Sequence, residues 1–203
     1  MSGAKLPHHF IRVTKGMKDD ARVWLTFMED FNGVNTFPDP DWLSDQSLEL
    51  FTDSAGSSDL GCGAFYHKSW SFFKWPCSWQ KTEILRDITF LELVPILLAI
   101  HTWGNDLRDK KVIFRVDNSA LATILNKKTS KSDRVMCLLR ELILVSMQYN
   151  IQFKAQHIAG VDNFIADAIS RFQWGKFRVL EPEAKAQPEP VPPRFLHLIS
   201  AVK

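Results

Sequence analysis

The order of strand-like and helix-like runs between residues 48 and 172 restricts the fold more than any other feature of this sequence. Apolar residues recur there at the spacing of strands in some runs and of helices in others. The predicted strands are 48–53, 61–66, 69–75, 112–117 and 151–156, and the predicted helices are 89–103, 119–125, about 135–145 and 163–172. This order predicts an α/β fold with a mixed five-stranded sheet. Its first three strands are antiparallel, its fourth is parallel to the first, and helices flank the sheet.

Local signals mark the ends of several helices. For helix 89–103 we expect Asp87 as the cap, Gly104 just past the end and a kink at Pro95. Near the start of the chain, Asp19 or Asp20 is expected to cap an amphipathic helix that ends at Gly33. The apolar face of that first helix is formed by Trp24, Phe27, Met28 and Phe31.

Prolines separate both ends of the chain from this central part. Pro38 and Pro40 follow the first helix, and five further prolines lie between residues 182 and 193. We therefore expect a helical extension with a linker (1–46), a core domain (47–174) and a proline-rich, linker-like tail (175–203). Both ends are expected to be dispensable for folding of the core.

Composition excludes several classes of protein. The chain has 203 residues, of which 45% are hydrophobic and 24% charged, so it has enough apolar material for a core but is too short for a complete polymerase. A formal net charge of +2 gives no general attraction to nucleic acid or to a membrane. The three cysteines are widely separated, as is typical of reduced thiols in an intracellular protein. No apolar run approaches the roughly 20 residues that span a bilayer, so no membrane segment is expected.

Four acidic residues fall where they can share one pocket. Asp53 and Asp117 each end a predicted strand, while Glu92 and Asp167 lie on predicted helices that can pack beside those strands. An unpaired carboxylate in the apolar surroundings of Glu92 would be unfavourable, and four carboxylates close together repel one another. Oxygen ligands of this kind favour Mg²⁺, with Mn²⁺ as an alternative. The pattern therefore predicts phosphodiester hydrolysis with two bound cations.

Five motifs make this interpretation more specific. They are FTDSAG (51–56), GCGA (61–64), LEL (91–93), VDN (116–118) and HIAGVDNFIADAISR (157–171). Together, over about residues 47–173, they resemble the ribonuclease H domain of retroelement reverse transcriptases. The tryptophan-rich hairpin, DITFLELVP (87–95) and HIAG (157–160) are most similar to DIRS-type, tyrosine-recombinase retrotransposons. Residues around the first helix resemble the connection segment that precedes this domain in such polyproteins.

The resemblance implies a ribonuclease H-like fold and an endonuclease that cuts the RNA strand of RNA:DNA hybrids by two-metal-ion catalysis. Its metal-binding and catalytic carboxylates would be Asp53, Glu92, Asp117 and Asp167. His157, on a mobile loop, would assist proton transfer or product release, and Asn163 would start a helix near the site. The implied partners are the hybrid and the polymerase part of a parent polyprotein. No polymerase activity is expected from this chain.

Other interpretations of individual residues stay open. His157 equally suits a hydrogen-bonded residue at the end of a strand. Asp162 is a competing candidate for the role of Asp167. The basic segment after helix 119–125 either contacts phosphates or forms a solvated turn between two helices. The residues proposed for nucleic-acid contact are Lys127, Lys128, Lys131, Arg134 and Asn118. The hairpin tryptophans are assigned to packing.

Two other functions compete with a ribonuclease H. An integrase or transposase nuclease shares the fold class but takes its acids in the order Asp, Asp, Glu, whereas Glu92 here lies on the first core helix. A catalytically inactive or domesticated nucleic-acid-binding relic is the other alternative. Loss of any one of the four acids would favour it, and all four are present.

Overall fold

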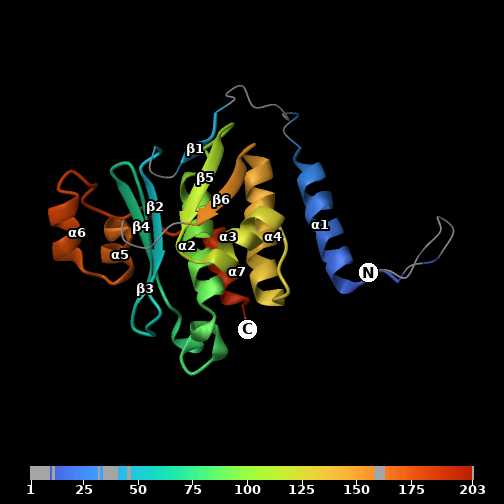
Figure 1. Ribbon diagram of the computed structural model, residues 1–203, viewed down its shortest axis with the longest axis horizontal. Coiled ribbons are helices and arrows are strands. Elements are labelled where there is room, and N and C mark those ends of the chain that lie inside the picture. The colour runs from blue at the N-terminus through green and yellow to red at the C-terminus, as the bar shows by residue number, and fades with distance from the viewer. Residues whose placement is uncertain are drawn as a thin grey trace.

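The computed structural model describes residues 10, 12–31, 33, 41–44, 47–157 and 163–202. Two three-stranded sheets lie next to each other, with helices packed around them (Figure 1). The α/β class predicted from the order of runs is confirmed. Asp162, the two prolines of the first linker and the boundary at residue 46 lie outside the described residues.

The first sheet is antiparallel and has the order β2-β3-β4. Its strands are β2 (Leu50–Ser54), β3 (Gly61–Tyr66) and β4 (Ser69–Lys74), close to the three predicted ranges. His67 and Lys68 form the turn of the β3–β4 hairpin, as predicted, and Tyr66 pairs with Ser69. The tryptophans of the hairpin region are buried, and the Trp75 indole donates to the Ala55 carbonyl over 2.7 Å. The assignment of these tryptophans to packing is confirmed.

The second sheet is parallel and has the order β1-β5-β6, which corrects the expected single five-stranded sheet. Its strands are β1 (Leu43–Ser44), β5 (Lys111–Val116) and β6 (Gln152–His157). We expected β2 to pair with β5, but it is β1 that does so, with Leu43 opposite Val112. The chain turns between β1 and β2, where Glu49 has a φ of 50°. Because that turn interrupts the extended backbone, β2 begins a separate ladder.

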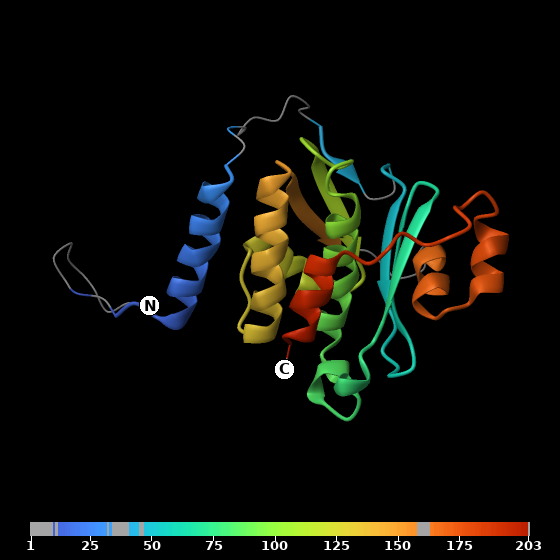
Figure 2. The same ribbon diagram turned by 180° about the vertical axis from the view of Figure 1, so that it is seen from behind.

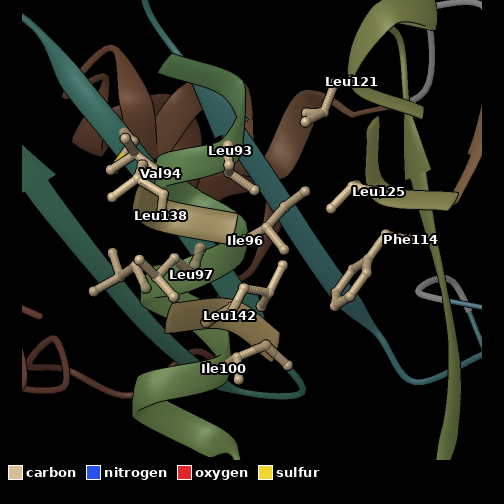
Figure 3. Packing of buried hydrophobic residues seen from close by; sticks show 14 of the residues in the cluster. Leu93, Val94, Ile96, Leu97, Ile100, Phe114, Leu121, Leu125, Leu138 and Leu142 are labelled. Atoms are coloured by element: carbon tan, nitrogen blue, oxygen red, sulfur yellow. The ribbon is translucent and has the colours of Figure 1, made fainter. Parts of the chain in front are cut away.

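Helix α2 (Ile88–Trp103) forms the centre of the core (Figure 3). Asp87 caps it as predicted, accepting from the Phe90 amide over 3.0 Å, and Gly104 follows its last residue. Pro95 lies inside the helix without ending it. Because α2 contacts the antiparallel sheet, α3 and α4, it is apolar on nearly all sides. Glu92 is the one charged residue within this helix.

The remaining predicted elements are α3 (Ser119–Lys127), α4 (Asp133–Gln148) and α5 (Phe164–Ser170). The face predicted for α4 is buried, and two of its leucines, Leu138 and Leu142, meet α2 (Figure 3). Helix α5 packs on β2 and β3. Figure 1 shows α2 and α5 on opposite sides of the antiparallel sheet. Strand β2 therefore lies between α2, which carries Glu92, and α5, which carries Asp167.

The first helix, α1 (Lys15–Glu29), lies beside α4 (Figure 1). Its cap is Thr14, whose side chain accepts from the Met17 amide, so the prediction of an aspartate cap is wrong. Of the predicted apolar face only Phe27 is buried, while Trp24 and Met28 are exposed. The contact with α4 is partly ionic, because Arg140 donates to Asp20 over 2.8 Å.

The chain after α5 differs from the expected linker. It forms α6 (Trp174–Leu180), crosses the molecule and ends in α7 (Pro193–Ser200), which packs on α2 (Figure 2). The expected boundary after residue 174 falls inside α6, and Phe177 and Phe195 are fully buried. The proline content predicted a linker, but the buried side chains of Phe177 and Phe195 hold this segment against the rest of the protein. Within the described residues, no helix has both the length and the apolar character required to cross a membrane.

Candidate active site

A cavity of about 410 Å³ opens where β2, α2, β5 and α5 meet. All four predicted acids line it, together with several other polar residues. The lining residues are Thr52, Asp53, Ser54, Glu92, Arg115, Val116, Asp117, Asn163, Phe164, Asp167 and Arg171. Residues separated by more than 100 positions in the sequence thus contribute to one polar cavity.

Asp53 and Glu92 form the buried side of the cavity. Burial raises the pKa of Asp53 to about 6, against a hydrogen bond from Ser170 and with Asp167 and Asp117 adding to the rise. Burial also raises the pKa of Glu92 to about 8, and the charge of Asp53 adds to it. Both shifts have the same physical cause, since a desolvated carboxylate near other acids is less stable when ionised.

Each of these two acids accepts a hydrogen bond from a serine. Ser54 Oγ donates to Glu92 Oε1 over 2.7 Å, and Ser170 Oγ donates to Asp53 Oδ2 over 2.6 Å. Ser54 follows Asp53 directly on β2, so the end of one strand supplies both an acid and the hydroxyl that holds the next acid. A hydroxyl donor stabilises a buried carboxylate and also limits its rotation.

Asp117 and Asp167 form the more open side. Asp117 follows the last residue of β5 and is exposed. Asp167 lies in the first turn of α5, where Arg171 forms an ion pair with its Oδ1 and Lys176 lies 3.3 Å from its Oδ2. Asp167 is therefore the acid whose charge is compensated by neighbouring cations.

The chemistry of these donors fits a hard divalent cation. All four are carboxylates, which are the oxygen ligands that Mg²⁺ and Mn²⁺ prefer. Burial, with a smaller contribution from the neighbouring acids, raises the pKa of Asp53 and of Glu92, and a bound cation would favour their ionised forms. In the described part of the chain, however, no three His, Cys, Asp or Glu side chains lie close enough together to form a metal-binding group. The residues that would hold the ion are thus identified by chemistry and by the cavity they share.

His157 and Asn118 do not line the cavity. The His157 ring lies at the end of β6, with Nε2 3.0 Å from the Asp117 carbonyl oxygen. Because a carbonyl oxygen only accepts, Nε2 carries the proton in this contact. Asn118 caps α3 by accepting from the Leu121 amide over 3.0 Å. Both side chains therefore stabilise the backbone around Asp117. For His157, this is the role of a hydrogen-bonded residue at the end of a strand, which was the alternative to a catalytic role.

The basic segment between α3 and α4 divides into two kinds of residue. Lys128 is half-buried, and its ammonium donates to the carbonyls of Leu125 and Phe153 over 2.7 and 3.0 Å. Burial lowers the pKa of Lys128 to about 8. This corrects the expectation that Lys128 reaches a phosphate, because its ammonium is already bound inside the protein.

The other three cations of the segment have different surroundings. Arg134 is turned towards Asp87, with 3.7 Å between Nη1 and Oδ2. Lys127 and Lys131 are exposed. Contact of these two exposed lysines with phosphates stays a prediction.

Several functional candidates were not anticipated from the sequence. Ser54, Ser170 and Arg115 belong to the cavity or contact its acids. Asn163 lies directly before α5 and lines the cavity, as expected of a residue that starts a helix near the site. Asn163 stands at the start of α5 but makes no capping hydrogen bond, and instead its Nδ2 donates to the Thr52 carbonyl over 2.6 Å. The spacing of Asp167 and Ser170 was a usable signal, because residues three apart share a helix face.

Comparison with known proteins gives limited information. A crystal structure of RNase H1 from the halophilic archaeon Halobacterium salinarum NRC-1 is similar to this chain with a TM-score of 0.43 and 12% sequence identity, over 64% of this chain and 95% of that chain. Similarity at this level establishes neither a common fold nor a common activity. No model of a known protein family matches the chain. No curated protein matches it either.

Proposed function

We propose that this chain is a metal-dependent endonuclease that hydrolyses the RNA strand of RNA:DNA hybrids. The observation that carries the proposal is the convergence of Asp53, Glu92, Asp117 and Asp167 on one cavity. Four carboxylates from two strand ends and two helices are unfavourable together without cations. Two cations bound by such carboxylates can hold a phosphate, activate water and stabilise a leaving oxygen, which is the chemistry of phosphodiester hydrolysis.

In this proposal the residues of the cavity have different roles. Bound Mg²⁺ or Mn²⁺, in a pair, would activate water and stabilise the leaving oxygen. The more buried acids, Asp53 and Glu92, and the more open acids, Asp117 and Asp167, would together hold these cations. The guanidinium groups of Arg115 and Arg171 line the same cavity and are donors of the kind that bind a phosphate.

The choice of a hybrid substrate and of a retroelement origin rests on the motifs. The run from His157 to Arg171 resembles the ribonuclease H domain of DIRS-type reverse transcriptases, and in this proposal the polymerase part of a parent polyprotein is a partner. Residues 47–174, over which the motifs lie, carry all four acids. The exposed apolar side chains of α1, such as Trp24, lie on the segment that resembles the connection to that partner.

Cleavage of labelled duplexes by the purified full chain tests the proposal. We expect cleavage of the RNA strand in an RNA:DNA hybrid with Mg²⁺ or Mn²⁺, no cleavage with EDTA, and none of double-stranded DNA. Asp53→Asn and Asp117→Asn should each lower the rate by at least about 100-fold, because each loses a charged ligand. Asp59→Asn, an exposed acid outside the cavity, is the matched control and should keep the wild-type rate.

Three results would contradict this function. Full activity in Asp53→Asn or Asp117→Asn would mean that the cavity is not the active site. Metal-independent cleavage would exclude the assigned role of the acids. Hybrid binding without cleavage by the wild-type chain would support the alternative of a catalytically inactive nucleic-acid-binding relic.

A further inference from the structure

Ser170 is a fully buried polar residue beside the cavity. It is 0% exposed, and its Oγ lies 2.6 Å from Asp53 Oδ2 and 3.0 Å from the Asp167 backbone carbonyl. A hydroxyl has one hydrogen, so it donates to only one of these oxygens at a time. The bond to Asp53 joins two residues that are 117 positions apart in the sequence.

A glycine on β3 allows this contact. Gly63 pairs with Asp53 across the antiparallel ladder. A Cβ added to Gly63 would lie 2.7 Å from side-chain atoms of Ile169 and 2.9 Å from the Ser170 nitrogen. Only a residue without a side chain lets α5 approach the sheet this closely. Asp53 and Ser170 are therefore brought together by the packing of α5 over Gly63.

A second polar contact fixes the other end of α5. Asn163, just before the helix, donates to the Thr52 carbonyl, one residue before Asp53. Helix α5 is thus attached to β2 at both ends, on either side of Asp167. These two attachments hold the helix that carries Asp167 against the strand that carries Asp53.

We propose that Ser170 is a positioning residue, which holds one oxygen of Asp53 and so orients this carboxylate, relative to Asp167, for binding a divalent cation. The inference rests on the proposed function, because it assigns Asp53 to the metal site. Hydrogen-bond partners of metal-ligating carboxylates orient the ligand, and their loss weakens metal binding. The competing interpretation is that the Ser170 hydroxyl only satisfies the Asp167 carbonyl, as serines within helices often do.

Calorimetric titration of the full chain with Mn²⁺ distinguishes the two roles. Ser170→Ala should bind Mn²⁺ about 10- to 100-fold more weakly than the wild type. Ser170→Cys keeps the size of the side chain but is a poor donor, so it should show a similar loss of affinity. The matched control is Ser146→Ala, which alters another buried serine, on α4 and outside the cavity. The hydroxyl of Ser146 has no hydrogen-bond partner among the described residues. This variant should bind Mn²⁺ as the wild type does.

The melting temperature in EDTA separates positioning from folding. A purely structural Ser170 would lower the melting temperature of Ser170→Ala and leave the Mn²⁺ affinity of the folded protein unchanged, which would overturn the inference. Wild-type Mn²⁺ affinity in Ser170→Cys would overturn it as well. If the wild-type chain bound no Mn²⁺ and cleaved no hybrid, the proposed function itself would fail, and that result is visible without any variant.

Discussion

Serine hydroxyls and acidic groups are paired at the inner wall of the cavity. Ser54 donates to Glu92 and Ser170 donates to Asp53, yet burial still raises the pKa of both acids. One neutral donor per acid does not compensate for the loss of water around a carboxylate. The two acids therefore lower the folding stability, a cost that is common at functional sites.

Replacing Glu92 by Gln tests this loss of stability. Gln has nearly the same shape but does not ionise, whereas a carboxyl whose pKa is raised by folding lowers stability at every pH above its unfolded pKa. In EDTA at neutral pH or above we therefore expect Glu92→Gln to be more stable than the wild type, by about 1 kcal/mol or more. In 10 mM Mg²⁺ the wild type should gain stability and the variant should gain little. Thermal unfolding with and without Mg²⁺ measures both effects. A variant that is less stable than the wild type in EDTA would show that the carboxyl group of Glu92 does not lower the free energy of unfolding.

At the scale of elements, the sequence predicted those whose signals are local. Strand β3 matches its predicted range, and α2 begins after Asp87 and stops before Gly104, because the pattern and the caps lie within the element itself. Strand β1 was not predicted, since two residues carry no period. The split of the sheet was not predicted either, because the turn before β2, where Glu49 has a φ of 50°, is not signalled by the residue type.

The turn between α3 and α4 gives a prediction that separates structure from binding. Lys127→Ala with Lys131→Ala should weaken hybrid binding and reduce its dependence on salt, because exposed lysines contact phosphates through screened charge. Lys128→Met should instead lower the stability of the protein, by about 1 kcal/mol or more, since it leaves two backbone carbonyls without their donor. Binding titrations at several salt concentrations, together with urea unfolding, measure the two effects. Equal salt slopes for the double variant and the wild type would favour the solvated turn.

The attachment of α7 to α4 depends on the ionised form of Glu141. Burial opposes its ionisation, but the close contacts of Glu141 with His101 on α2 and Arg194 on α7 outweigh burial and hold its pKa below the usual 4.5. The Arg194 Nε lies 2.5 Å from Glu141 Oε1, and His101 Nε2 lies 3.3 Å from the same oxygen. Glu141 therefore joins three helices through one carboxylate.

The pH dependence of stability tests this contact. A carboxyl whose pKa is depressed by folding contributes stability above its unfolded pKa, and this contribution is lost as the pH falls through the folded value. Glu141→Gln should be less stable than the wild type at pH 7, by about 2 kcal/mol. The difference should shrink as the pH falls below 4.5. Urea unfolding of both proteins between pH 7 and pH 3 measures it, and a difference independent of pH would contradict the assigned role.

At the scale of the whole molecule, the tail packs along the antiparallel sheet and onto α2. Between α6 and α7 the chain runs beside β4, where the amides of Lys185 and Glu189 donate to the carbonyls of Lys68 and Trp70. This segment covers the edge of the antiparallel sheet at β4. Proteins usually cover sheet edges that could otherwise pair with another chain. The proline pattern concealed this role, because prolines suit a segment that crosses a surface as well as they suit a free linker. The four acids could be predicted, since strand ends and helix faces follow from local periods, whereas the path of the tail depends on long-range packing.

The packing of α7 decides whether the tail is part of the folded unit. Phe195 is 0% exposed and its ring lies edge-on to Phe73, with 5.3 Å between the centroids, whereas the adjacent Leu196 is 42% exposed. Phe195→Ala should therefore destabilise the protein by about 3–5 kcal/mol, because it leaves a large cavity in the core. Leu196→Ala on the same helix should change stability by no more than about 0.5 kcal/mol. Urea unfolding of the full chain measures both. Equal and small effects would mean that the tail is dispensable for folding, as its composition suggested; a large effect of Phe195→Ala alone would place the end of the domain at or beyond α7.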